Sequence, residues 1–235
     1  MRLKKGEFII DLTDPSSFID HLSGTKFLGE GTQTKLKLRA SSGTRVLLRC
    51  YGDTMLIDGM KIEVDQANAG ETAFLICRPG NGGRNLILGP DIEIDGAKDD
   101  NGGSGWSVHV IAPDATTNFT GIFAEGEWHH CNRAWLKTNA HTSEQNLIRF
   151  GSKLLLHDMF AEPIALNTPA GRVYDVVIEH TSRNLKTARS AHVALGSAED
   201  VLVSARVYGT GKARLPSRGR RPPSAAHRML LRDDG

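Results

Sequence analysis

The sequence has few aromatic residues and no long hydrophobic run. Aromatic residues make up only 6% of its 235 residues, although hydrophobic residues make up 39%. A core built from Val, Ile and Leu with few rings favours short strands over a helical bundle. No segment approaches the roughly 18 consecutive apolar residues that a membrane-spanning helix needs, so we expect no membrane partner.

Cysteine is also scarce. Cys50, Cys77 and Cys131 are widely spaced and form no CxxC pair, which argues against a disulfide framework and a structural zinc site. We expect no cofactor and no metal ligand set. The basic N-terminus is followed by an apolar run far shorter than the roughly 7–15 residues of a secretory signal. The sequence therefore predicts cytoplasmic synthesis without a secretory signal peptide.

The charge is nearly balanced but unevenly distributed. The 29 Lys and Arg against 27 Asp and Glu leave a net charge of +2, which indicates neither nucleic acid nor an anionic membrane as a partner. Residues 212–235 form a basic, Pro- and Arg-rich tail, more typical of a solvated linker or docking arm than of a nucleic-acid site. Its apolar stretch His227–Leu231 is expected to dock on the last coil or on a partner.

One segment has the pattern of a helix. Asp14 suits the N-cap and Pro15 the first helical turn. Phe18, Ile19 and Leu22 then form a single apolar stripe. We expect residues 1–24 to contain a strand followed by a helix that covers the end of the fold.

The remaining sequence repeats. The first apolar residue of each repeat recurs every 22–32 residues, at Leu36, Ile62, Ile92, Ile122, Leu154, Val176 and Val201. Each repeat carries a second short apolar strand, with Gly, Asn or Pro at the corners. Variable periods of this size are typical of a solenoid whose coils differ in turn length. The sequence thus predicts an all-β fold, a right-handed parallel β-helix of three-sided coils over residues 25–211.

An antiparallel sandwich or jelly roll is the alternative, since it also has many short strands. Its hairpins would carry two-residue Asn-Gly or Asp-Gly loops between paired strands. Asp58-Gly59 and Asp95-Gly96 instead recur once per period, which favours the solenoid.

Three stretches, Thr25–Leu38, Met55–Val64 and Tyr174–His180, resemble coils of the pectin-lyase-like β-helix superfamily. The resemblance covers roughly residues 8–211. It implies the right-handed β-helix, but lyases, glycosidases, phage tailspikes and virion proteins share that fold. Among these, the likeness to the tailspike and virion proteins implies a homotrimer.

The enzyme motifs of that superfamily are not matched. Asp99-Asp100 lacks the Gly-His-Gly string of the related glycosidases, and Arg78-Pro79 with Arg84 has the wrong spacing for a pectate lyase. We therefore favour a non-enzymatic structural or adhesion protein of a virion or cell surface, of the spike, fibre or decoration kind. Its partners would be other copies, other virion or surface proteins and, in some contacts, polysaccharide.

Acidic residues recur at the strand ends. Asp65, Asp95 and Glu125 lie 30 residues apart, and His157 follows at the aligned position of the next coil. Stacked coils would place them in a column about 5 Å apart. One hypothesis is catalysis, as a lyase or glycoside hydrolase that cleaves an acidic glycan with these carboxylates as acid and base. A second is that the column binds a divalent cation or a carbohydrate. The third is that these residues cap turns and face water.

Aromatic and basic residues gather between two of the strands. They are Trp128, His129, His130, Arg133 and Trp135, and Trp106, which lies earlier in the chain, is a further candidate for stacking on a sugar. Tryptophan faces stack on sugar rings, and Arg or His can hold acidic groups. The same residue types also favour a subunit interface, so both interpretations stay open. The neighbouring histidines His129 and His130 do not predict a metal site, because adjacent side chains on a strand diverge.

Overall fold

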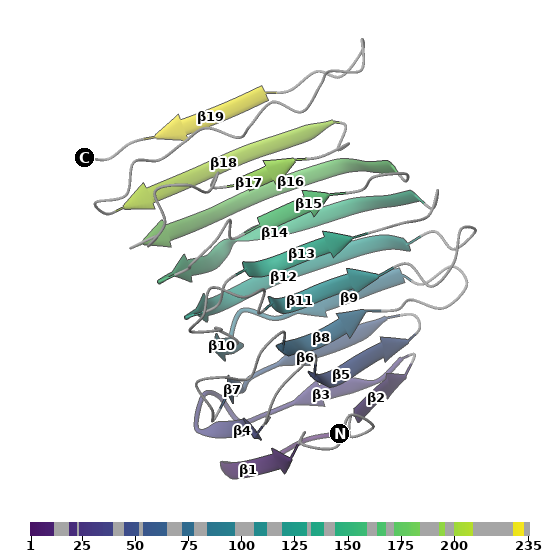
Figure 1. The fold of residues 1–235 in the computed structure, drawn as a ribbon, viewed down its shortest axis with the longest axis vertical. Coiled ribbons are helices and arrows are strands. Elements are labelled where there is room, and N and C mark those ends of the chain that lie inside the picture. Colours follow the sequence, from purple (N-terminus) through teal and green to yellow (C-terminus); the bar gives the residue numbers. More distant parts are fainter. Residues whose placement is uncertain are drawn as a thin grey trace.

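The computed structural model shows a stack of parallel β-strands (Figure 1). The structure describes residues 1–11, 19–22, 24–39, 45–51, 54–64, 72–77, 84–96, 106–111, 119–130, 133–138, 144–158, 164–167, 172–183, 193–195, 200–208 and 228–232. Every strand pair among these residues is parallel. The antiparallel alternative is therefore wrong, and the fold is all-β and solenoid-like.

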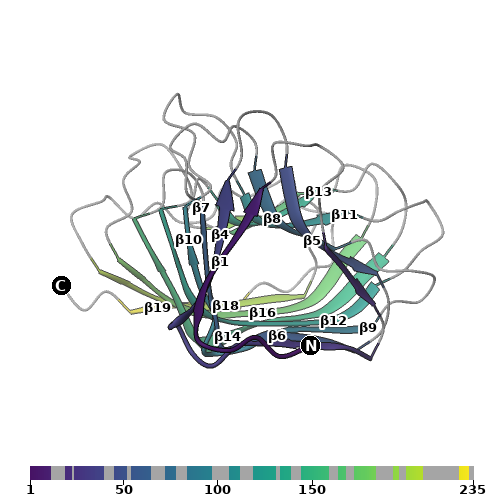
Figure 2. The same ribbon diagram turned by 90° about the horizontal axis from the view of Figure 1, so that it is seen from below.

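The strands form two sheets. The twelve-stranded sheet contains β1 (Gly6–Asp11), β3 (Lys26–Leu28), β4 (Thr34–Arg39), β6 (Met55–Asp58), β7 (Lys61–Val64), β9 (Arg84–Leu88), β10 (Glu93–Asp95), β12 (Phe119–His129), β14 (Glu144–His157), β16 (Arg172–Arg183), β18 (Val201–Tyr208) and β19 (Arg228–Arg232). The seven-stranded sheet contains β2 (Ile19–Leu22), β5 (Arg45–Tyr51), β8 (Thr72–Cys77), β11 (Trp106–Ile111), β13 (Arg133–Thr138), β15 (Ile164–Asn167) and β17 (Val193–Leu195). Figure 2 looks along the stack and shows these strands as three walls around a common interior.

The core consists of columns of apolar side chains that run along the stack. In β4, residues with buried and partly exposed side chains alternate, as expected for strands with one face in a core. The clearest column passes through the register partners Phe27, Ile57, Leu88, Ala124, Phe150, Ile178 and Val203, all of them buried. Burying such a side chain fully contributes about 1.5–3 kcal/mol. Stacking therefore supplies the burial that a single coil lacks.

A second column marks a corner of the coils. Met55, Leu86, Ile122, Ile148, Val176 and Val201 are register partners. The residue before each of them has a left-handed backbone, namely Thr54, Asn85, Gly121, Leu147, Asp175 and Asp200. Asn, Asp and Gly adopt this conformation readily, whereas Leu does so at a cost. The chain thus enters the same wall through the same bend in successive coils.

β12 joins two walls of the stack. Its first half pairs with β9 and its second half with β10, with a register shift between Ala124 and Gly126. Gly126 has a φ of 99°, and a Cβ there would lie 2.4 Å from the carbonyl oxygen of Ile92. Glycine is therefore required at this bulge. The bulge directs Glu127–His129 onto the wall that carries the site described below.

The N-terminal helix is not present where the structure describes the chain. Ile19–Leu22 forms β2, whose residues pair in parallel with Leu48–Tyr51 of β5. Residues 12–18 lie outside the described residues. Residues 19–22 form a strand despite their helical spacing, because a strand here gains hydrogen bonds to β5 and extends the seven-stranded sheet.

The sequence alignment of the coils is correct in part. Leu36 pairs with Ile62, and Val176 pairs with Val201, as expected. Ile62 pairs with Ile94 instead of Ile92, because β10 begins only after the corner at Gly89–Ile92. Similarly, Gly126 is the partner of Leu154 in place of Ile122. Corners of unequal length thus shift the register of the middle coils by several residues.

The apolar stretch in the tail joins the stack. Arg228–Arg232 forms β19, which pairs in parallel with Leu202–Arg206 of β18. This resolves the two expectations for that stretch in favour of docking on the last coil. No helix in the described part of the chain is long and apolar enough to cross a membrane.

Candidate functional site

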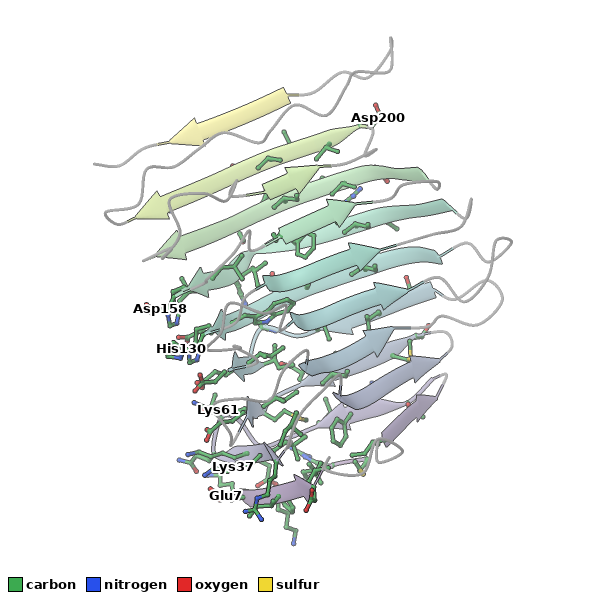
Figure 3. All side chains as sticks on the ribbon, in the orientation of Figure 1. Glu7, Lys37, Lys61, His130, Asp158 and Asp200 are labelled. Carbon is green, nitrogen blue, oxygen red and sulfur yellow. The ribbon has the colours of Figure 1, made fainter. Side chains whose placement is uncertain are left out.

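Polar side chains form columns on the outer surface of the wall made by β4, β7, β10 and the second halves of β12 and β14. One column follows the register partners Lys37, Glu63, Asp95, His129 and His157. A parallel column follows Lys35, Lys61, Glu93 and Glu127. Both alternate along their strands with the buried residues Ile62, Ile94, Trp128 and Leu156, so they face outward. Figure 3 shows this side of the stack, with Lys37, Lys61, His130 and Asp158 along one edge.

Lys61 is the cation at the centre of these columns. Its Nζ lies 2.8 Å from both Glu93 Oε1 and Asp95 Oδ2, and its side chain is 16% exposed. Burial alone would lower the pKa of Lys61, but the hydrogen bonds to Asp95 and Glu93 raise it above its ordinary value. Lys61 therefore stays charged and ties its own coil to the next.

The two carboxylates next to Lys61 stay ionised. Burial alone would raise the pKa of both Glu93 and Asp95. Hydrogen bonds from Lys61 to both acids, from His129 to Glu93 and from His130 to Asp95 outweigh burial and lower each pKa below its ordinary value. Both groups therefore act as acceptors at neutral pH.

His129 is the buried member of the site. It is only 7% exposed, and its Nε2 lies 3.1 Å from Glu93 Oε1. An ionised carboxylate can only accept, so Nε2 carries the proton and donates to Glu93. In the neutral ring, Nδ1 then keeps a lone pair. That atom lies 3.0 Å from His130 Nδ1 and 3.3 Å from Asp95 Oδ1.

His130 turns back over His129. Its φ is 53°, a left-handed backbone, and its Nδ1 lies 2.8 Å from Asp95 Oδ1. Gly96 and Asp158, which follow the register partners Asp95 and His157, also have positive φ. The expectation that the two histidine side chains diverge is therefore wrong. Side chains diverge only while both residues are extended, and the strand ends at His129.

His157 continues the site on the next coil. Its Nε2 lies 2.9 Å from Glu127 Oε1, and its Nδ1 lies 2.9 Å from Asp158 Oδ2. The rings of His129 and His157 are stacked, with centroids 4.6 Å apart and planes inclined by 8°. We name His129, His130, His157, Glu93, Asp95, Glu127 and Asp158 the histidine–carboxylate cluster.

The predicted carboxylate column takes a different form. Asp95 has Glu63 and His129 as register partners, not Asp65 and Glu125. Glu125 lies in the β12 bulge, one corner away from Asp95. Asp65 is outside the described residues. The register shift at the bulge is what separates Glu125 from Asp95 and brings His129 into its place.

The predicted aromatic group is divided between two sheets. Trp128 is fully buried, and its Nε1 donates to the carbonyl oxygen of Glu125. Its ring is part of the core and has no exposed face for a sugar. Trp106 and Arg133 are register partners in the other sheet, and Trp135 follows on β13. Only the backbones of these three residues are described.

Sequence reasoning missed Lys61, Glu93, Glu127 and Asp158 as members of this site. Strand alternation could have indicated that the first three face outward. That the His130 side chain turns back toward His129 had a weaker signal in the sequence. Asp95, the register partner of His129, is followed by a glycine, which suggests a left-handed turn at the same place in the next coil.

Two groups of the cluster have donor atoms close enough to hold one metal ion. They are Asp95 with His129 and His130, and Glu127 with His129 and His157. Imidazole and carboxylate donors suit first-row transition metals. No family model, curated protein or solved structure matches the chain.

Proposed function

We propose that the chain is a right-handed parallel β-helix with a structural role, a component of a virion or cell-surface assembly. The right-handed sense follows the resemblance and the strong preference of parallel crossover connections for that hand. The observation that carries the proposal is the set of ion pairs between successive coils on the outer wall. Lys37 contacts Glu7 and Glu63, and Lys61 contacts Glu93 and Asp95.

These contacts favour a scaffold over a hydrolase. Each pair joins residues from different coils, so these contacts tie β1, β4, β7 and β10 together. A glycosidase needs one carboxylic acid with a raised pKa that can protonate the leaving group. Asp95 has the opposite property, since its pKa is lowered. That supports the structural role over cleavage of an acidic glycan.

The first strand supports self-association. Phe8 and Ile10 are register partners of the buried Leu36 and Leu38 and so extend the core columns. Phe8 is nevertheless 37% exposed, and the outward-facing Ile9 is 53% exposed. Exposed apolar side chains on a strand are a surface that another chain can cover. We propose a second copy as that chain, and a homotrimer as the assembly that the resemblance implies.

Sedimentation of the full chain tests the assembly. Wild-type protein should sediment with three times the mass of one chain, and a Phe8→Ser, Ile9→Ser variant should sediment as a monomer. Leu155→Ser, which changes an outward residue in the middle of the stack, should still sediment as a trimer. A wild-type monomer at all concentrations would overturn the proposal.

An activity assay separates the two functional classes. We expect no release of reducing ends or unsaturated products from pectate, alginate or other acidic polysaccharides. Cleavage by the wild type that disappears in Asp95→Asn would instead establish the polysaccharide-active enzyme.

A further inference from the structure

We infer that Asp95, His129 and His130 form a binding site for a single divalent transition-metal ion, with Zn²⁺ as the simplest occupant. Their three donor atoms converge on one point of the outer wall. Asp95 Oδ1, His129 Nδ1 and His130 Nδ1 form a triangle with sides of 2.8, 3.0 and 3.3 Å. The site lies within one chain and is independent of how chains assemble.

The size of the triangle fits a bound metal ion. Zinc binds imidazole nitrogen and carboxylate oxygen at about 2.0–2.2 Å. At that bond length, neighbouring donor atoms lie about 2.9 Å apart for right angles and about 3.4 Å apart for tetrahedral angles. The three observed separations lie close to this range. Two nitrogens and one oxygen favour Zn²⁺ and its first-row neighbours over Ca²⁺ and Mg²⁺, which take oxygen donors.

His129 is set in the tautomer that a metal requires. Its Nε2 donates to Glu93, so its lone pair at Nδ1 points into the triangle. Metal-bound histidines are generally oriented by such a carboxylate on the other ring nitrogen. Glu93 is itself fixed by Lys61, 2.8 Å away. A buried histidine with this partner is a preorganised ligand.

His130 is the exposed ligand of the site. Its Nδ1 lies 2.8 Å from Asp95 Oδ1 and 3.0 Å from His129 Nδ1. The His130 side chain is 49% exposed, so its Nε2 can be solvated and water can complete the coordination of the ion.

The second donor group is less suitable. Glu127 and His157 would have to share His129, whose Nε2 already donates to Glu93. In addition, the His129 and His157 rings are stacked nearly parallel. Their in-plane lone pairs therefore run side by side, whereas His129 and His130 are inclined by 69°. His157 is thus a matched control, a histidine of the same cluster that does not hold the ion.

Titration of the chelator-treated full chain with Zn²⁺ alone tests the inference. Wild type and His157→Asn should bind one ion per chain. His130→Asn keeps a residue that tolerates the left-handed backbone and should bind at least about tenfold more weakly. Saturating Zn²⁺ should raise the melting temperature of wild type and His157→Asn by about 5–10 °C, and that of His130→Asn much less. Comparable metal-free melting temperatures of the three proteins would show that each is folded.

Three results would overturn the site. They are no binding to wild type at millimolar Zn²⁺, equal affinity of His130→Asn and wild type, and loss of binding in His157→Asn with retention in His130→Asn. The first result would mean that the three side chains only contact one another.

Discussion

Replacement of Lys61 by Met would test whether the ion pairs on the outer wall stabilise the fold. The substitution keeps the length of the aliphatic stem but removes the cation that Glu93 and Asp95 share. Each lost contact is a charge-assisted hydrogen bond of 2.8 Å between side chains that are at most 22% exposed. Such bonds contribute about 1.5–3 kcal/mol each, and partial exposure places these at the lower end. We expect Lys61→Met to lower the free energy of unfolding by about 2–3 kcal/mol at pH 7.

The loss should depend on pH in a definite direction. Folding lowers the pKa of Glu93 and Asp95, so their contribution is complete above the ordinary carboxyl pKa. It is lost as pH falls through the lowered values, because both acids are then protonated in the folded protein too. The difference between wild type and Lys61→Met should therefore be largest near neutral pH and shrink at acid pH.

Urea denaturation with chelator present, monitored by tryptophan fluorescence, measures the loss in unfolding free energy and its dependence on pH. Lys35→Met is the matched control, since Lys35 is the register partner of Lys61 on β4 and makes no ion pair with a described residue. It should change the free energy of unfolding by less than about 0.5 kcal/mol. Equal losses for the two variants, or a Lys61→Met loss that does not diminish in acid, would refute the reasoning.

Three further substitutions test the architecture by denaturation. Gly126→Ala should destabilise by more than about 2 kcal/mol, since its Cβ would overlap the Ile92 carbonyl at positive φ; Gly24→Ala, with positive φ but open space, should cost only about 1 kcal/mol. Trp128→Phe should cost about 1–3 kcal/mol through a lost hydrogen bond and a small cavity, and an unchanged stability would contradict the core position of the ring. Leu147→Asn should stabilise by about 0.5–1 kcal/mol by relieving the left-handed bend; a loss as large as that of Leu155→Asn would contradict this.

Local patterns were sufficient to predict the class of fold. Alternation of apolar and polar residues, as in Thr34–Arg39, predicts strands, and their recurrence predicts stacked coils. The pairs Leu36–Ile62 and Val176–Val201 follow from the same pattern. These predictions succeed because an isolated coil cannot bury its apolar face, so the repeat itself requires a neighbour.

Local patterns misled where long-range pairing competes with them. Ile19–Leu22 has helical spacing and a good capping residue upstream, yet it pairs with β5 as a strand. The neighbouring strand offers hydrogen bonds and burial that the residues themselves do not reveal. The predicted register of the middle coils was wrong for the same reason. The corner at Gly89–Ile92 and the bulge at Gly126 decide which residues pair across coils.

The histidine–carboxylate cluster shows most clearly which features the sequence determines and which the tertiary structure determines. The sequence by itself determined that Asp95 ends a strand and that His129 and His130 are available as donors. Only the tertiary structure decided that they meet, because the bulge sets His129 beside Asp95 and the left-handed backbone of His130 turns its ring back. Both effects depend on contacts between coils more than thirty residues apart in sequence, which the order of residues along one strand does not specify.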